Sequence, residues 1–269
     1  DSLSDDEIGS FGAVFNSMVI NLRELDQMKA DFVSVMVHQL RAPLTGMKWV
    51  LKLILDGEIG VMTDEQKDVV KQGYETNEKM IELVNDLLNV SRIENQKLGY
   101  RFEKNDFIKV LDAVVLNTEL ARKDRNINLH IENHTRDLEP FFFDEEKLSM
   151  AFQNLIDNAI KYTLPGGKVT IGITKEGDNL KVKISDTGLG IPASDVPKLF
   201  TKFFRASNVV HLEMEGSGLG LFIVKNIILG HSGKISVESV EGKGTSFTVV
   251  IPLVNSMQVT EEHQSSGEV

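Results

Sequence analysis

The 269-residue sequence contains no cysteine, so disulfide bonds and thiolate metal sites are excluded and a reducing compartment suits the chain. It also lacks a signal peptide and any run of about 18 apolar residues, so the chain as given is expected to be soluble. Basic residues are outnumbered: 29 Lys and Arg stand against 40 Asp and Glu, a net charge of −11. Nucleic-acid binding relies on clustered basic residues, so no nucleic acid is expected as a partner.

An apolar heptad pattern runs through the first part of the sequence. Apolar residues alternate in steps of four and three, which is the spacing of a coiled-coil seam. The pattern predicts one helix from about Phe11 to Leu55, about 65 Å long at the rise of an α-helix. The seam begins with Phe11, Phe15, Met18, Leu22 and Leu25.

A short break, "DGEIGVM", separates this segment from a second helical pattern that fades near Ser91. Thr63 and Gln66 have the spacing of a capping box at its start. Two long helices with a short loop predict an antiparallel hairpin, and two hairpins would form a four-helix bundle in a homodimer. The alternative is a monomeric hairpin packed on the C-terminal part of the chain.

From Tyr100 onward the pattern changes to mixed helices and strands. Helices are predicted over "FIKVLDAVVLNTELARKDRN", from near Asp144, and over "GLGLFIVKNIILGH". Strands are predicted at "INLHIEN", in a hairpin around the turn "KEGDN", and in a closing hairpin that includes "GKGTSFTVVIP". This order predicts an α+β domain with helices on one face of a mixed sheet. The polar tail, 256–269, is predicted to be disordered.

Two glycine clusters, "DTGLGIP" and "GSGLGLFIV", match neither the GxGxxG nor the GxxxxGK[ST] nucleotide motif. The second cluster, with Gly216, Gly218 and Gly220, leads directly into an apolar helix whose free N–H groups could hold phosphate oxygens. Each cluster taken alone is equally explained as a turn.

A set of polar residues favours a magnesium nucleotide as the ligand. Asn154 and Asn158 share a helix face, with Lys161 and Tyr162 one turn further on. Amide oxygens suit a hard cation and the lysine suits phosphate. Asp186 ends a strand, where a buried carboxylate could accept hydrogen bonds from an exocyclic amine. A single asparagine would be an ordinary surface amide, so the prediction depends on the combination.

The ordered motifs resemble those of a sensor histidine kinase over nearly the whole chain. "FVSVMVHQLRAPLTGMKWV" resembles the phosphoacceptor box, "NLIDNAIKYT" the N box, "DTGLGIP" the G1 box and "LFTKFFRA" the F box. "GSGLGLFIVK" resembles the G2 box and "GKGTSFTVVIP" the last glycine box. The resemblance implies a dimerisation and phosphotransfer hairpin followed by a GHKL (Bergerat-type) ATP-binding sandwich.

For catalysis, the resemblance implies that His38 accepts the γ-phosphoryl group of ATP. Arg205 would reach the transferring phosphate, and Asn158 would bind Mg²⁺. Phosphohistidine would then pass its phosphoryl group to an aspartate of a response-regulator receiver domain. Phe203 and Phe204 would anchor a mobile lid over about 193–217.

For nucleotide binding, the resemblance implies a pocket in which Asp186 recognises the adenine amine and Thr245 lines the adenine end. The glycines would let the backbone approach the base and the phosphates. The residues implied are Asn154, Asn158, Lys161, Tyr162, Asp186, Gly188, Gly190, Gly216, Gly218, Gly220, Leu221 and Thr245.

The sequence departs from the family next to the histidine. Gln39 replaces the usual acid, which accepts a hydrogen bond from the imidazole, so a working but slower autokinase is predicted. Ala42 replaces a Thr or Asn that helps place water, so weak phosphatase activity is predicted. Pro43 should bend the helix beside His38, and such a bend would allow a coiled-coil input to switch the site.

The predicted domains are the second half of a HAMP relay (1–25), the phosphotransfer hairpin (26–97), the catalytic ATP-binding domain (98–255) and the tail (256–269). The sequence is interpreted as the cytoplasmic portion of a plasma-membrane protein, attached to the membrane only through missing N-terminal segments. Two alternatives remain: a degenerate scaffold that binds nucleotide and regulator, and a chaperone-type or mismatch-repair-type ATPase. Four other histidines, His130, His134, His211 and His231, are expected at the surface or at helix caps.

Overall fold

The computed structural model describes residues 5–135, 138–211 and 216–253. The chain divides into two compact units, Asp1–Leu98 and Gly99–Val269. Among the helices of the described residues, none is long and apolar enough to cross a membrane.

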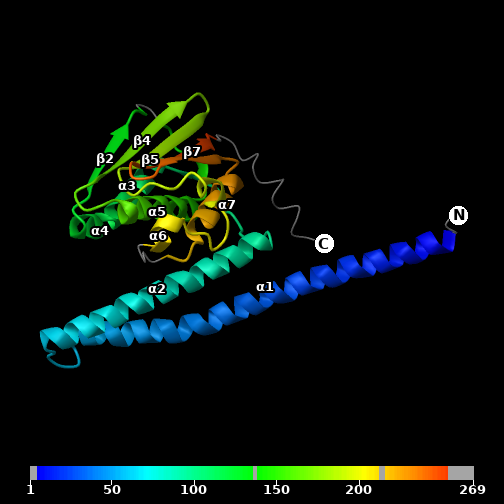
Figure 1. Cartoon of the computed structure of the whole chain (residues 1–269), viewed down its shortest axis with the longest axis horizontal. Helices are drawn as coiled ribbons and strands as arrows, with labels where there is room; N and C mark the ends of the chain where they lie inside the picture. Colours follow the sequence, from blue (N-terminus) through cyan, green and yellow to red (C-terminus); the bar gives the residue numbers. More distant parts are fainter. Residues whose placement is uncertain (1–4, 136–137, 212–215, 254–269) are drawn as a thin grey trace. The chain divides into compact units, whose positions relative to one another are not determined.

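The first unit is a helical hairpin, as predicted. Helix α1 (Asp5–Leu55) begins earlier than the heptad pattern indicated, and α2 (Asp64–Glu94) continues slightly beyond Ser91. The two helices run side by side from the connecting loop (Figure 1). The predicted capping box is present, with the Thr63 hydroxyl accepting from Gln66 N at 3.3 Å and the Gln66 side chain accepting from Thr63 N at 3.0 Å.

The hairpin is held together around the phosphoacceptor segment. Val37 and Leu44 lie one heptad apart on α1 and pack against Val84 of α2. Buried Asn77 donates from Nδ2 to the carbonyl of Leu44 at 2.9 Å, which fixes the register of the two helices at this level. Because these contacts occupy the inner side of α1, they leave the neighbouring His38 exposed.

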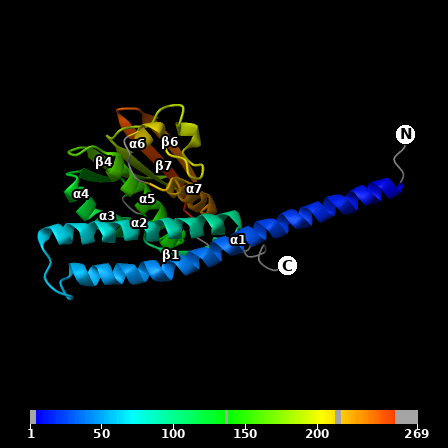
Figure 2. The ribbon, with the colours of Figure 1, turned by 60° about the horizontal axis from the view of Figure 1, so that its bottom comes forward.

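Pro43 lies inside α1 without ending it. A proline removes the N–H that would bond to the carbonyl four residues earlier, here that of Gln39. In two views the axis of α1 changes direction between its N-terminal part and the part beside α2 (Figures 1 and 2). The helix therefore continues through the proline, and its axis is not straight over its whole length.

The second unit contains a five-stranded mixed sheet with strand order β2-β4-β5-β7-β6. β2 and β4 are parallel, and the other neighbouring pairs are antiparallel. This arrangement confirms the predicted mixed sheet and both hairpins. The strands are β2 (Asn128–Asn133), β4 (Lys168–Glu176), β5 (Asn179–Asp186), β6 (Lys234–Val240) and β7 (Gly244–Pro252).

Helices cover one side of this sheet (Figure 1). Alternating residues of β4, such as Ile171, are fully buried, as are Leu155 of α5 and Ile227 of α7. Shortening a buried Leu or Ile to alanine typically costs about 2–5 kcal/mol, so this layer stabilises the unit strongly. The helices are α3 (Phe107–Asn117), α4 (Glu119–Asp124), α5 (Glu145–Tyr162), α6 (Ser207–His211) and α7 (Gly220–Gly230), with a 3₁₀ turn at Val196–Lys198.

Two features differ from the sequence-based expectation. The helix predicted from Phe107 is split into α3 and α4 at buried Thr118, whose hydroxyl donates to the Val115 carbonyl at 2.7 Å and so helps to end the first helix. A small antiparallel sheet of β1 (Glu103–Asn105) and β3 (Phe141–Phe143) was not predicted. Strands of three residues are too short to show alternation in the sequence.

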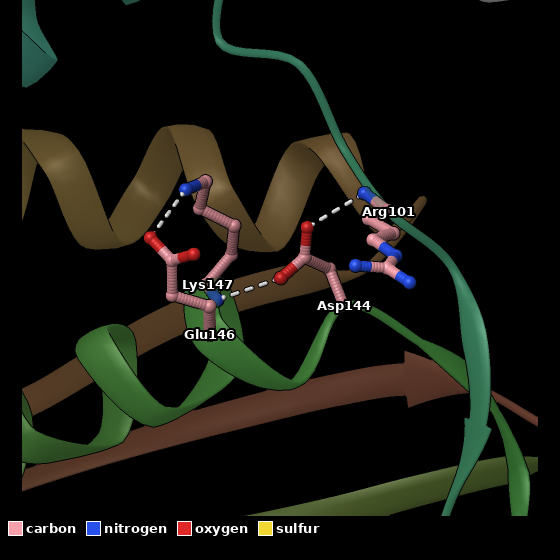
Figure 3. Close-up of polar contacts among 4 residues, drawn as sticks. All are labelled: Arg101, Asp144, Glu146 and Lys147. Carbon is pink, nitrogen blue, oxygen red and sulfur yellow. Dashed lines mark hydrogen bonds and ion pairs between the residues drawn. The ribbon is translucent and has the colours of Figure 1, made fainter.

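Asp144 begins α5 as predicted and also holds the incoming chain. One carboxylate oxygen accepts from Lys147 N at 2.9 Å, the N-cap bond, and the other accepts from Arg101 N at 2.7 Å (Figure 3). An ion pair between exposed Glu146 and the largely buried side chain of Lys147 lies beside them. A single carboxylate therefore joins the start of the unit to the helix that carries the N box.

Candidate functional site

The polar face of α5 forms one wall of the candidate site. Asn154, Asn158 and Tyr162 follow one another at four-residue steps and are half-buried, while the opposite face of the helix is in the core. Asn154 donates to the Met150 carbonyl at 3.2 Å. Within the described residues, the Asn158 side chain makes no hydrogen bond, so its amide is available to a ligand.

The glycine loop before α7 lies directly against this wall. A methyl group on Gly220 would overlap Asn154 Oδ1, so a larger residue here would force the Asn154 side chain to move. A Cβ on Gly216 would lie 3.4 Å from Lys161 Nζ and 3.8 Å from the Tyr162 hydroxyl. The predicted phosphate loop and the predicted phosphate-binding lysine are therefore neighbours. Leu221 follows in the first turn of α7, and its exposure is intermediate.

Asp186 forms the floor of the site at the end of β5. Its Oδ1 accepts hydrogen bonds from Gly188 N at 2.8 Å and from Thr245 N at 3.2 Å. Burial raises the pKa of Asp186 above its ordinary value, and the two N–H donors offset part of that effect. A half-buried carboxylate with acceptor capacity left over suits recognition of an amine.

The loop after β5 is fastened on both sides. Leu189 N donates to the Tyr162 carbonyl at 3.1 Å, and a side chain at Gly188 would collide with that carbonyl. On the other side, Gly242 N donates to the Leu189 carbonyl at 2.7 Å, and Gly190 lies against the Val240 carbonyl. The loop therefore links α5 to the β6–β7 turn.

Arg205 reaches the same region from the chain before α6. Its Nε and Nη2 are buried without a partner in the described part of the chain. Burial raises the pKa of Tyr162, and the positive charge of Arg205 opposes this shift. A guanidinium held with two unused donors suits an anionic ligand.

The F-box residues contact the second glycine cluster. Phe203 is exposed and has a left-handed backbone (φ 60°), and Gly218 packs against that backbone. Phe204 is half-buried. Part of the predicted lid, residues 212–215, lies outside the described residues.

His38 and Gln39 belong to the first unit, where both are exposed on α1. In the described ranges, no three His, Cys, Asp or Glu side chains gather as a metal site. Near the glycine loops, the amide oxygen of Asn158 is a donor that suits a hard cation.

The remaining histidines agree with the expectation where they are described. His130 and His134 are exposed. His231 caps the end of α7 and is buried, with Nδ1 2.8 Å from the Ile227 carbonyl and Nε2 accepting from Asp144 N at 3.1 Å. The side chain of His211 lies outside the described set.

Two family models match the chain. Residues 28–96 match the His Kinase A (phospho-acceptor) domain, and residues 143–255 match the histidine kinase-, DNA gyrase B- and HSP90-like ATPase domain. The chain belongs to the sensor histidine kinases. The phosphoacceptor match encloses His38, and the ATPase match encloses every nucleotide-binding residue predicted above.

The chain is similar to parts of longer histidine kinases. It is 33% identical over 240 residues to the circadian input-output histidine kinase CikA of Synechococcus elongatus, a match covering 88% of this chain and 32% of CikA. It is 32% identical over 240 residues to the sensor histidine kinase WalK of Bacillus subtilis, covering 87% of this chain and 38% of WalK. The chain thus spans about a third of the length of these curated relatives.

Solved structures show the same fold. The Acinetobacter baumannii histidine kinase AdeS is 29% identical with a TM-score of 0.57, over 81% of this chain and 98% of that chain. The full-length ShkA structure in complex with AMPPNP has a TM-score of 0.69 at 23% identity, over 85% of this chain and 47% of that chain. The predicted hairpin and α/β sheet architecture is confirmed by these neighbours.

Sequence reasoning missed residues of the kinase that support the site without lining it. Arg125 donates to the Lys161 carbonyl at 2.9 Å and so caps the end of α5. Ser239 binds the loop after β5 through Ile191 N at 2.9 Å. Ser239 could have been noticed as a polar residue on the inward side of an alternating strand, whereas Arg125 gives no signal in the sequence.

Proposed function

We propose that the chain is an ATP-dependent protein-histidine autokinase that phosphorylates His38 and passes the phosphoryl group to a response-regulator aspartate. The observation that carries the proposal is the convergence of Asn154, Lys161, Asp186 and Arg205 around two glycine loops, in a chain whose other unit presents an exposed histidine. The family matches support ATP binding and histidine phosphorylation.

In this proposal Asp186 accepts a hydrogen bond from the adenine amine, while Lys161 and the N–H groups at the start of α7 bind the phosphates. Asn158 holds Mg²⁺, which supplies positive charge to the phosphate oxygens. Arg205 adds its guanidinium to the transferring group. Phosphoryl transfer depends mainly on such positioning and charge neutralisation, so no covalent enzyme group besides the histidine is needed.

His38 reacts as a neutral imidazole. The exposed position on α1 gives the ring free access for both ATP and a receiver domain. In the reaction Gln39 would accept a hydrogen bond from the other ring nitrogen but carries no charge, and Ala42 offers no hydroxyl for water, so slow phosphorylation and weak phosphatase activity are proposed.

The domain assignment follows the same scheme: a HAMP-like segment (1–25), the phosphotransfer hairpin (26–97), the ATP-binding domain (98–255) and the tail (256–269). The separation of two compact units after Leu98 supports the central boundary. The exposed heptad seam of α1 supports a homodimer. A membrane-anchored parent protein is proposed from WalK, which is named a sensor kinase.

The test is incubation of the full chain with γ-labelled ATP and Mg²⁺. Label that is acid-labile and base-stable, absent from His38→Ala and retained in His130→Ala, is the expected result. His130 is a matched control because it is an exposed histidine of the other unit. Adding a receiver domain should then move the label to its aspartate. Phosphate release without protein label would overturn the autokinase assignment.

A second candidate is a scaffold that binds nucleotide and regulator but transfers little. Gln39 and Ala42 favour it, since both positions beside His38 lack the family's functional groups. Tight ATP binding with no label on His38 would support this candidate.

A further inference from the structure

A serine outside the predicted site connects the segments around the adenine end. Ser239 lies on β6, half-buried, and its Oγ accepts from Ile191 N at 2.9 Å. The same Oγ lies 3.0 Å from the Gly244 carbonyl and 2.9 Å from Thr245 Oγ1. One hydroxyl thus touches the loop after β5 and the first two residues of β7.

Counting hydrogens assigns the direction of these bonds. A serine hydroxyl has one hydrogen and can accept two bonds. The Gly244 carbonyl can only accept, so the Ser239 hydrogen points to it, and Ile191 N–H occupies one lone pair of Oγ. The contact with Thr245 must then use the hydrogen of Thr245. The Thr245 hydroxyl is left with lone pairs only.

This direction determines what a ligand meets beside Asp186. Thr245 N already donates to Asp186 Oδ1 at 3.2 Å, so the threonine and the aspartate are adjacent. With the threonine hydrogen turned toward Ser239, both side chains present acceptors. Such an edge favours an N–H donor and repels a carbonyl oxygen, because facing acceptors leave a buried polar group unpaired.

We propose that Ser239 is a positioning residue that makes Thr245 an acceptor and thereby selects a 6-amino purine over a 6-oxo purine. This inference depends on the proposed binding of ATP at Asp186. Ser239 touches no nucleotide in this scheme and acts through the hydroxyl of Thr245. Without Ser239, the Thr245 hydrogen becomes free to donate to a 6-oxo group.

The probes are ATP and inosine triphosphate, which differ at position 6 by an amine against an oxygen. Their affinities are measured for the full chain and for Ser239→Ala. We expect the preference for ATP over inosine triphosphate to fall by about tenfold in Ser239→Ala, the value of one well-formed hydrogen bond. Ser239→Thr, which keeps the hydroxyl, should restore the preference.

The matched control is Ser246→Ala. Ser246 forms a similar hydroxyl pair with Ser185 at 2.8 Å in the same sheet, one residue from Thr245, without contacting the Thr245 hydroxyl. This variant should keep the wild-type preference. An equal loss of the preference for ATP in Ser246→Ala and Ser239→Ala would overturn the inference, because any hydroxyl removed from this sheet would then have the same effect.

A double substitution separates positioning from simple support of the loop. In Thr245→Val there is no hydroxyl to orient, so adding Ser239→Ala should leave the nucleotide preference unchanged. A further tenfold loss in that background would show that Ser239 acts without Thr245 and would refute the proposal. If the wild-type chain binds neither nucleotide, the proposed function is wrong. If it binds ATP and Ser239→Ala keeps the same preference for ATP over inosine triphosphate, only the inference about Ser239 is wrong.

Discussion

The side chains next to His38 are expected to affect the rates of its phosphorylation chemistry. His38, Gln39 and Ala42 all lie exposed on α1, and within the described residues Gln39 has no side-chain partner. Solvent is therefore the alternative acceptor for the imidazole proton. An amide accepts the imidazole proton less strongly than a carboxylate would. Because these side chains are exposed, substitutions here should change the reaction rates and leave the hairpin intact.

Gln39→Glu should accelerate autophosphorylation, by up to about 10²-fold, because a carboxylate accepts the imidazole proton more strongly than an amide. The measurement is the initial rate of label incorporation at saturating ATP. Gln39→Met, which has similar length and no acceptor of comparable strength, is the control and should not be faster than the wild type. An unchanged rate in Gln39→Glu would mean that solvent already suffices.

Ala42→Thr should increase dephosphorylation of a phosphorylated receiver domain several-fold, since a hydroxyl can hold the attacking water. Ala42→Val is the control, because valine has nearly the shape of threonine but no hydroxyl, and this variant should behave like the wild type. Loss of phosphoryl label from the receiver, with Mg²⁺ present, is the readout. Rapid dephosphorylation by the unmodified chain would contradict the role given to Ala42.

Asp186→Asn should weaken ATP binding by roughly tenfold or more, because an amide N–H would face the adenine amine. Thermal stability without nucleotide should not fall, since burial already raises the pKa of Asp186 and disfavours its charged form. Exposed Asp178→Asn is the control for both measurements. A large loss of stability would identify Asp186 as structural.

At the scale of elements, the ends of α5 and α7 are joined through one histidine. Neutral His231 fits its site: Nδ1 lies near the Ile227 carbonyl and Nε2 accepts from Asp144 N. Burial lowers the pKa of His231 from 6.5, and the nearby Asp144 charge offsets part of that shift. The rings of Tyr100 and Phe102 complete the enclosure, and burial raises the pKa of Tyr100 to about 12.

The stability of the chain should therefore decrease on acidification below pH 6.5. Because the folded pKa of His231 is lowered, the unfolded chain binds more protons between that pKa and 6.5, and stability is lost as the pH falls through this window. The slope reaches about 1.4 kcal/mol per pH unit for one group. Urea unfolding from pH 7.5 to 5.5 measures it, and His231→Gln should flatten the slope while His130→Gln should not. An identical slope in His231→Gln would exclude this origin.

At the scale of the whole molecule, the exposed apolar seam of α1 indicates that this helix packs against a partner helix. Phe15, Leu22 and Leu25 are 55–62% exposed although their spacing is that of a coiled coil. Burying an exposed Leu is worth about 1.5–3 kcal/mol, so a helix with several such residues gains substantially from a second copy. The hairpin core around Val37 and Val84 does not include these three residues.

We expect a homodimer in sedimentation equilibrium at micromolar concentration, and Leu22→Glu should shift it toward monomer. Asn21→Glu adds the same charge at the adjacent exposed position and should keep the dimer. A monomeric wild-type chain would contradict the seam interpretation.

Periodicity and spacing determined the long helices, the hairpins of the sheet and the Thr63 cap, because these depend on neighbouring residues. The sequence also determined the chemistry of the candidate site, since the glycine loops, amides and Asp186 are each visible as motifs. It did not reveal the break at Thr118, which depends on one hydroxyl turning back to its own helix, or the short β1–β3 pair.

Only the tertiary structure decided which distant residues meet. Gly220 faces Asn154 and Gly188 faces Tyr162, although these residues are separated by tens of positions along the chain. The same holds for Ser239 and Thr245, whose bond depends on the register of β6 and β7. Local sequence specifies which groups are present, whereas their protonation, burial and hydrogen-bond direction arise from packing of the sheet and its helices.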